Sequence, residues 1–170
     1  MDNNEQIVRI WLETKGYLVK NRLKYKIKRG TSAGWCDIDL LAYNPLDGKR
    51  VAVDVTAWMT EKICFSSVDN PANGTYKRLH SISSPESRSE IRKFFNIEND
   101  SEYELWHVVS FISETQRDQV TDACKQFVDK VIEFPTIMKE LIEYVKTNPN
   151  VTQETEALQT IRALVLCNMI

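Results

Sequence analysis

Hydrophobic and polar residues alternate in two consecutive stretches of the chain, residues 35–44 and 49–58, and a Pro-Leu-Asp-Gly turn at 45–48 separates them. Alternation on both sides of a turn is typical of a β-hairpin. Centring the hairpin on this turn makes one face wholly apolar, with Ile38 opposite Val55, Leu40 opposite Val53 and Ala42 opposite Val51. A shift of one residue would turn the apolar side chains of one strand to the wrong face, so the pattern defines the register modulo two.

The other face of the predicted hairpin carries acids, with Asp37 opposite Thr56 and Asp39 opposite Asp54. Side chains directly opposite each other lie roughly 5 Å apart, and like charges there repel. Aspartate is also a poor strand residue. Two interpretations are open. The pair binds a hard cation such as Mg²⁺, which carboxylates hold together with water and phosphate oxygens, or the acids are solvated or paired with a nearby lysine.

The same patterns predict the remaining elements. Apolar residues at helical spacing indicate helices over 3–15, 84–95 and 114–132, from Pro135 to the break at 148–150, and over 152–167. Asn3 or Asn4 would cap the first helix and Gly16 would end it, while Thr152 would cap the last. Alternation predicts strands over 17–29 and 103–112, and the turn residues at 66–75 predict a loop. The order predicts one α/β domain with a mixed sheet and C-terminal helices over 114–170 packed on it.

The runs Asp-Ile-Asp-Leu-Leu-Ala at 37–42 and Val-Ala-Val-Asp-Val-Thr-Ala-Trp at 51–58 resemble the core of the restriction-endonuclease-like PD-(D/E)xK nuclease superfamily. Asp39 matches the first acid of the family motif, and Asp54 matches the second in its Asp variant. Thr56 stands where the family usually has lysine. The resemblance covers residues 1–113, and it implies an αβββαβ core to which the C-terminal helices are an addition.

The resemblance also implies a chemistry, the hydrolysis of DNA phosphodiester bonds with Mg²⁺ or Mn²⁺. Asp39, Asp54 and the backbone carbonyl of Val55 would hold the ion, which lowers the pKa of bound water and neutralises charge in the transition state. Glu5 on the first helix would contact the ion or its water, although an acid there also suits the helix N-terminus. Thr56 can hydrogen-bond a water but brings no charge. Lys62, Lys77 or a second ion would then replace the missing lysine.

Five basic residues alternate along the predicted strand at 17–29 and point to one face: Lys20, Arg22, Lys24, Lys26 and Lys28. A row of this kind can follow a phosphate backbone. It can equally protect an exposed strand edge from aggregation. Edge protection is slightly favoured, because no aromatic residue alternates with the cations on this face. The two interpretations are compatible.

The composition is that of an ordinary globular protein. The chain has 170 residues, a formal net charge of −2, 42% hydrophobic and 27% charged residues, which suits one ordinary globular domain. Nucleic-acid affinity would therefore come from a local basic patch. No apolar run is long enough for a membrane span. The four cysteines form no CxxC pair and indicate reduced thiols in a cytoplasmic protein.

Three classes of function remain open at this stage. The chain is a metal-dependent nuclease, a nuclease-fold module that binds nucleic acid or a protein partner without cleaving, or a structural protein with solvated acids. Asp39 and Asp54 favour the first class over the third. Thr56 and the acidic net charge favour the second over the first. The C-terminal helices would offer a surface for a homodimer or a protein partner. His107, inside a predicted strand, is interpreted as a satisfied structural residue.

Overall fold

The computed structural model describes residues 2–29, 32–57, 62–148, 155–167 and 169. A five-stranded mixed sheet forms its centre, in the order β1-β2-β3-β5-β7. The neighbours β1–β2 and β2–β3 are antiparallel, and β3–β5 and β5–β7 are parallel. The bounds are β1 Leu18–Arg29, β2 Ser32–Tyr43, β3 Arg50–Thr56, β5 Glu104–Val109 and β7 Lys130–Glu133.

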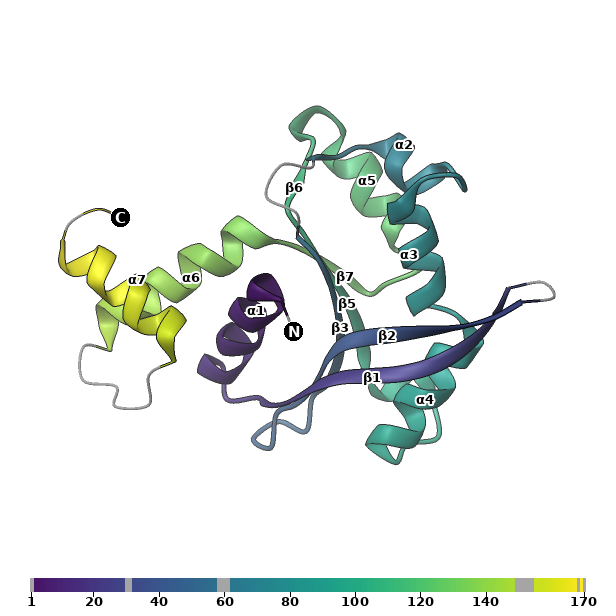
Figure 1. Ribbon diagram of the computed structural model, residues 1–170, viewed down its shortest axis with the longest axis horizontal. Helices are drawn as coiled ribbons and strands as arrows, with labels where there is room; N and C mark the ends of the chain where they lie inside the picture. Colours follow the sequence, from purple (N-terminus) through teal and green to yellow (C-terminus); the bar gives the residue numbers. More distant parts are fainter. Residues whose placement is uncertain (1, 30–31, 58–61, 149–154, 168, 170) are drawn as a thin grey trace.

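Helices cover both faces of the sheet (Figure 1). One face packs against α1 (Asn3–Thr14) and α6 (Phe134–Thr147), and α7 (Glu156–Leu166) packs against α6; Trp11, Val53 and Leu141 are among the buried side chains of this first core cluster. The other face packs against α3 (Gly74–Ile82), α4 (Pro85–Phe95) and α5 (Arg117–Cys124), with Leu79 and Leu105 in the second cluster. The short helix α2 (Phe65–Asp69) and a small parallel sheet, β4 (Lys62–Ile63) with β6 (Phe111–Ile112), lie beyond the second face.

The predicted hairpin register is confirmed close to the turn and ends at Leu40. Leu40 pairs with Val53 and Ala42 with Val51, as the apolar pattern predicts. The prediction that Ile38 shares their face is wrong, because Leu40 lies in the first core cluster and Ile38 in the second. Side chains two residues apart on a regular strand share a face. The strand β2 therefore makes a half turn around Asp39, at the point where its ladder with β3 stops.

A matching turn in β1 divides the basic row. Arg22 has a φ of 54°, a left-handed conformation rare for a residue in a strand. Val19, before it, packs in the first cluster, whereas Leu23, after it, packs in the second. Lys20 lines a hollow beside Leu41 on the α4 side. The five cations therefore do not form the single face that strict alternation predicts.

Several predicted helix and loop boundaries are wrong for local reasons. Residues 66–75, predicted as a loop, belong partly to α2 and α3, and Asn73 caps α3. The helix predicted over 114–132 contains only the 3₁₀ turn Glu114–Gln116 and α5, and the chain then forms β7. The C-terminal segment therefore contributes a strand to the main sheet. Asp2 caps α1, and Thr155 caps α7. The predicted cap Thr152 lies outside the described residues.

The predicted helix at 84–95 and the predicted strands at 17–29 and 103–112 are confirmed. The helix α4 begins at Pro85 with Ser84 as its cap, and β1 and β5 lie within the predicted strands. None of the four cysteines is part of a disulfide. None of the helices in the described part of the chain is long and apolar enough to cross a membrane.

Candidate functional site

A polar cavity of about 820 Å³ opens where β2 and β3 separate. Its walls come from α1, from the facing parts of β1, β2 and β3, and from α3 and β4, so residues far apart in the sequence meet there. The lining includes the acids Glu5, Asp37 and Asp39 and the cations Arg22, Lys62 and Arg78. Charged side chains of both signs therefore surround one solvent-filled space.

Asp39 lies where β2 and β3 separate, and its side chain accepts the hydrogen bond that a backbone carbonyl of β2 would otherwise accept from β3. The antiparallel ladder between β2 and β3 stops at the Leu40–Val53 pair. The backbone N–H of Val55 instead donates to Oδ2 of Asp39 at 2.7 Å. A buried backbone N–H without a partner is costly, and this bond both satisfies it and orients the carboxylate. Asp39 is only 5% exposed.

Asp54, on β3, is completely buried and uses both carboxylate oxygens. Its Oδ2 accepts a hydrogen bond from Nδ1 of His107 at 3.0 Å. The two side chains meet because β3 and β5 are parallel neighbours that pair Asp54 with His107. Its Oδ1 accepts from the guanidinium of Arg78. A buried carboxylate is tolerated only with such partners.

Arg78 is the cation that joins the two acids. It lies on α3, and its Nη2 is 3.2 Å from Oδ2 of Asp39 while the same guanidinium contacts Asp54. Its Nη1 lies 3.7 Å from Asp37. One positive charge therefore serves three carboxylates, and only a small part of the Arg78 side chain reaches solvent. Sequence reasoning proposed the neighbour Lys77 for this position, but Lys77 is exposed on α3 and is not among the residues that line the cavity.

The two acids titrate in opposite directions. Burial, and then the negative charge of Asp54, raise the pKa of Asp39 to about 7. Burial alone would also raise the pKa of Asp54, but the hydrogen bond from His107 and the charge of Arg78 outweigh it and lower that pKa. At neutral pH the site therefore carries one firmly ionised acid and one close to its midpoint.

Thr56 faces the cavity and is linked to Asp54 through His107. Its Oγ1 lies 3.1 Å from Nε2 of His107. The ionised carboxylate of Asp54 can only accept, so Nδ1 of His107 carries a hydrogen, and in the neutral imidazole Nε2 accepts the hydroxyl hydrogen of Thr56. A contact of 3.5 Å from Oγ1 to the carbonyl of Val108 is the longer alternative. The satisfied structural role predicted for His107 therefore includes orienting a residue of the site.

Glu5 and Arg22 complete the wall opposite α3. Glu5, predicted from the resemblance to act at the metal, is buried on α1, and its Oε2 lies 3.9 Å from Nη2 of Arg22. The left-handed turn at Arg22 directs this side chain towards the acids, and its Nε lies 3.3 Å from Oδ2 of Asp37. The fold thus brings Glu5, Asp39 and Thr56 to the same cavity.

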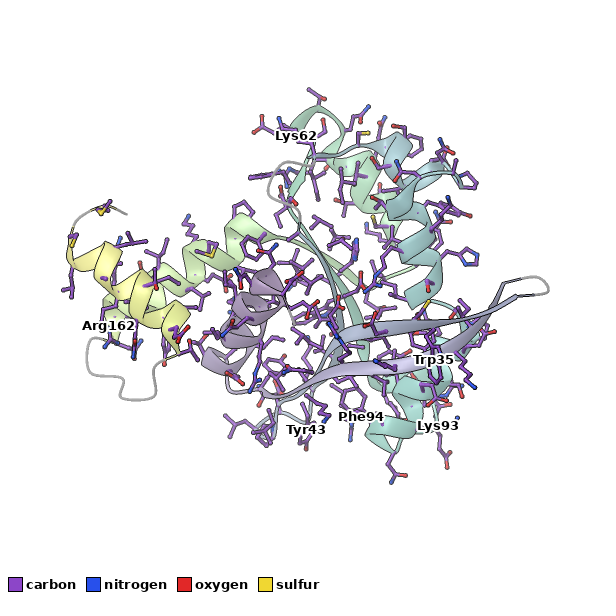
Figure 2. All side chains as sticks on the ribbon, viewed as in Figure 1. Trp35, Tyr43, Lys62, Lys93, Phe94 and Arg162 are labelled. Carbon is purple, nitrogen blue, oxygen red and sulfur yellow. The ribbon has the colours of Figure 1, made fainter. Side chains whose placement is uncertain are left out.

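The other predicted cations are dispersed. Lys62, on β4, lines the far side of the cavity and is labelled in Figure 2. Lys24 and Lys26 are exposed on the projecting part of β1, and Lys20 lies on the opposite face. The side chain of Lys28 is outside the described residues.

The donor chemistry of the site suits a hard cation, but Arg78 now occupies the space between the acids. Asp39, Asp54 and Glu5 supply carboxylate oxygens, which Mg²⁺ prefers. Among the described residues, however, no three His, Cys, Asp or Glu side chains are arranged as a metal site. The guanidinium contacts both Asp39 and Asp54. The carboxylates therefore fit a divalent ion only if Arg78 moves away from them.

No family model, curated protein or solved structure matches the chain. A function for this site is therefore argued from its geometry. Sequence reasoning missed Arg78, the structural link through His107 and the place of Asp37 in the wall. The only local signal was the Lys77-Arg78 pair after the turn residues. The partners of His107 depend on parallel pairing between strands about fifty residues apart, which local pattern does not reveal.

Proposed function

We propose that the chain is a divalent-cation-dependent nuclease of the PD-(D/E)xK type that hydrolyses DNA phosphodiester bonds at this cavity. One observation carries the proposal. Asp39, which lines a polar cavity, and Asp54, which is completely buried, both contact the guanidinium of Arg78 where β2 and β3 separate. Two carboxylates held together repel each other, so the fold maintains a site with affinity for positive charge.

The order of the elements supports the same proposal. A helix, three antiparallel strands, a helical segment and a strand parallel to the third follow one another from α1 to β5. Apart from the short strand β4, this order is compatible with the αβββαβ core that the resemblance of residues 37–42 and 51–58 implies. Both acids lie at the separation of the second and third strands, and Glu5 reaches the cavity from the first helix.

Asp39 and Asp54 would hold the ion, with Glu5 beside it. When bound, the ion would polarise the phosphate and lower the pKa of a bound water. An ion held by Asp39 and Asp54 would compete with the positive charge of Arg78, so Arg78 would have to give up its contacts with these carboxylates. Its guanidinium would then be available for a phosphate, which arginine binds in a bidentate manner. Arg78 thus supplies positive charge that Thr56 lacks.

Thr56 has a different role from the lysine that the family usually carries at this position. Because its hydroxyl hydrogen points to Nε2 of His107, the lone pairs of Oγ1 are directed away from that ring. Thr56 therefore accepts a hydrogen bond from a water in the cavity and orients it. It cannot neutralise the charge that develops on the phosphate. Arg78 and Lys62 are the cations of the cavity wall that can do so.

A second candidate function is a nuclease-fold module that binds nucleic acid without cleaving it. The observation in its favour is that Arg78 already neutralises both acids without an ion. A site that had lost its lysine and its metal would be stabilised in this way. The two candidates differ in whether the site cleaves DNA, for which a divalent ion must displace Arg78.

Thermal unfolding with added Mn²⁺ at pH 8 tests the metal site, since Asp39 is then ionised. An ion that binds only the folded chain raises the melting temperature. We expect the shift in the parent protein, none in Asp39→Asn or Asp54→Asn, and an unchanged shift in the control Asp47→Asn, an exposed acid of the hairpin turn. No shift in the parent at any pH above 6 would exclude the metal site.

Cleavage is measured on the same proteins with plasmid and single-stranded DNA. The nuclease proposal predicts Mn²⁺-dependent cleavage that both Asn variants lose. If the parent binds Mn²⁺ but does not cleave, and Thr56→Lys cleaves, the second candidate is correct and catalysis has been lost at residue 56.

A further inference from the structure

The strands β1 and β2 extend as a two-stranded ribbon past the edge of the other strands (Figure 1). Beyond the half turn at Arg22 and Asp39, one side of this ribbon carries Tyr25, Ile27 and Ile38, which pack in the second core cluster. The alternate residues face the other way, and no helix covers them in the described structure. The ribbon therefore has one buried and one solvent-exposed side.

The exposed side combines cations with a large aromatic ring. Lys26 pairs directly with Trp35 across the two strands, and Lys24 pairs with Asp37. The indole of Trp35 is 68% exposed, whereas the other described tryptophans, Trp11 and Trp106, are each 4% exposed. The ammonium of Lys26 lies 5.0 Å from the centre of the Trp35 ring. Sequence reasoning sought an aromatic residue on β1 itself, and the neighbouring strand supplies it.

This surface is continuous with the cavity of the candidate site. Asp37 lines the cavity and lies two residues along β2 from Trp35, roughly 7 Å away at the rise of a strand. On β1, Arg22 lines the cavity two residues from Lys24. Arg22 and Arg78 offset the charge of Asp37, at 3.3 Å and 3.7 Å. A nucleic-acid backbone lying along the ribbon would therefore have a cation beside it, first Lys24 and then Arg22, all the way to the cavity that holds the acids.

We propose that Trp35, with Lys26 and Lys24, is a binding site for an unpaired nucleobase and its phosphate. Bases inside a duplex stack on each other, so an exposed ring can receive only a base that is single-stranded or displaced. Aromatic rings beside lysines are the usual platform for single strands. The inference builds on the proposed function and names its substrate class: single-stranded DNA, or DNA with an unpaired end close to the cleaved bond.

Binding is measured without metal ions, with EDTA present, so that cleavage does not contribute. The probes are a fluorescent oligothymidine and a duplex of equal length, followed by anisotropy. We expect Trp35→Ala to weaken binding of the single strand about tenfold and Trp35→Phe to retain most of it. The matched control is Tyr43→Ala, which removes an exposed ring under Arg50 at the opposite end of β2 (Figure 2).

Salt dependence separates stacking from charge. Trp35→Ala removes no charge and should leave the slope of affinity against salt unchanged. Lys24→Ala and Lys26→Ala should each reduce the slope by about 0.7 for every phosphate that the lysine would otherwise neutralise. Melting curves of all variants verify folding, and because these side chains are exposed we expect no change.

The inference is overturned if Trp35→Ala binds the single strand as the parent does, or if the parent prefers the duplex. It is also overturned if the parent binds neither probe. These outcomes are distinct from failure of the nuclease proposal. Trp35-dependent binding without any cleavage would refute catalysis alone, whereas cleavage that ignores Trp35 would refute the stacking site alone.

Discussion

Oγ1 of Thr56 lies 3.1 Å from Nε2 of His107, and this hydrogen bond ties a cavity residue to a fully buried imidazole. On its other side the imidazole donates to Asp54. In the neutral imidazole the hydrogen of His107 is therefore on Nδ1, and the hydroxyl hydrogen of Thr56 points to Nε2. In this arrangement Oγ1 of Thr56 is a fixed acceptor for a water in the cavity.

Replacing Thr56 by valine tests this bond. Valine has nearly the same shape but leaves Nε2 of buried His107 without a donor. An unsatisfied buried polar atom costs about 1–3 kcal/mol, so the free energy of unfolding in urea should fall by that amount. Thr56→Ser retains the hydroxyl and serves as the control. Equal stability of the valine variant and the parent would contradict the assignment.

The raised pKa of Asp39 makes stability depend on pH. Its folded-state pKa is about 7 and its ordinary value is 3.8, so the folded chain holds the proton more tightly. The free energy of unfolding should therefore fall as pH rises from 3.8 to about 7 and then level off. At 1.36 kcal/mol per pKa unit the fall from this group is up to about 4 kcal/mol.

Asp39→Asn should remove the fall in the free energy of unfolding between pH 3.8 and about 7, and Asp47→Asn should leave that fall unchanged. Asp54 acts in a separate window, because its pKa is lowered. Its stabilising contribution is present above 3.8 and is lost as pH falls through its lower folded-state pKa. A profile that is unchanged between pH 4 and 7 in Asp39→Asn would contradict the raised pKa.

Removing Arg78 should reveal the repulsion between the acids. Arg78→Leu leaves the buried carboxylates without their cation, and losing one partner of a buried pair costs about 3 kcal/mol. We expect this loss in urea unfolding at pH 8 and a smaller loss at pH 5, where Asp39 is protonated. Lys77→Leu, at an exposed position on the same helix, is the control. Equal effects of the two variants would show that Arg78 has no such role.

Cys64 should alkylate at a lower pH than Cys124. Hydrogen bonds from Ser66 and Ser67, whose Oγ atoms lie 3.0 Å and 3.2 Å from Sγ, lower its pKa to about 7. Burial raises the pKa of Cys124 to about 11. Mass spectrometry after iodoacetamide treatment should show half-maximal labelling of Cys64 near pH 7 and protection of Cys124. Replacing both serines by alanine should move the midpoint of Cys64 towards 9.0.

The sequence by itself determined the parts of the fold that depend on local pattern. Alternation and the turn at 45–48 defined the pairing of Leu40 with Val53, because any other parity would expose apolar side chains. Capping and proline chemistry located the start of α4 at Pro85. The unusual acids Asp39 and Asp54 marked the site, since nothing in a strand's own preferences favours them.

Tertiary structure alone decided the rest. The half turn at Arg22 and Asp39 breaks the two-residue period, and only packing against α3 and α4 determines which side chains are then buried. The segment 130–133 has apolar residues that suit a helix or a strand, and the free edge of β5 makes it a strand. Arg78 reaches the acids because α3 docks beside β2, and Trp35 joins Lys26 because β2 pairs with β1. Such contacts join distant residues, and their free energy exceeds the local preferences that a sequence pattern records.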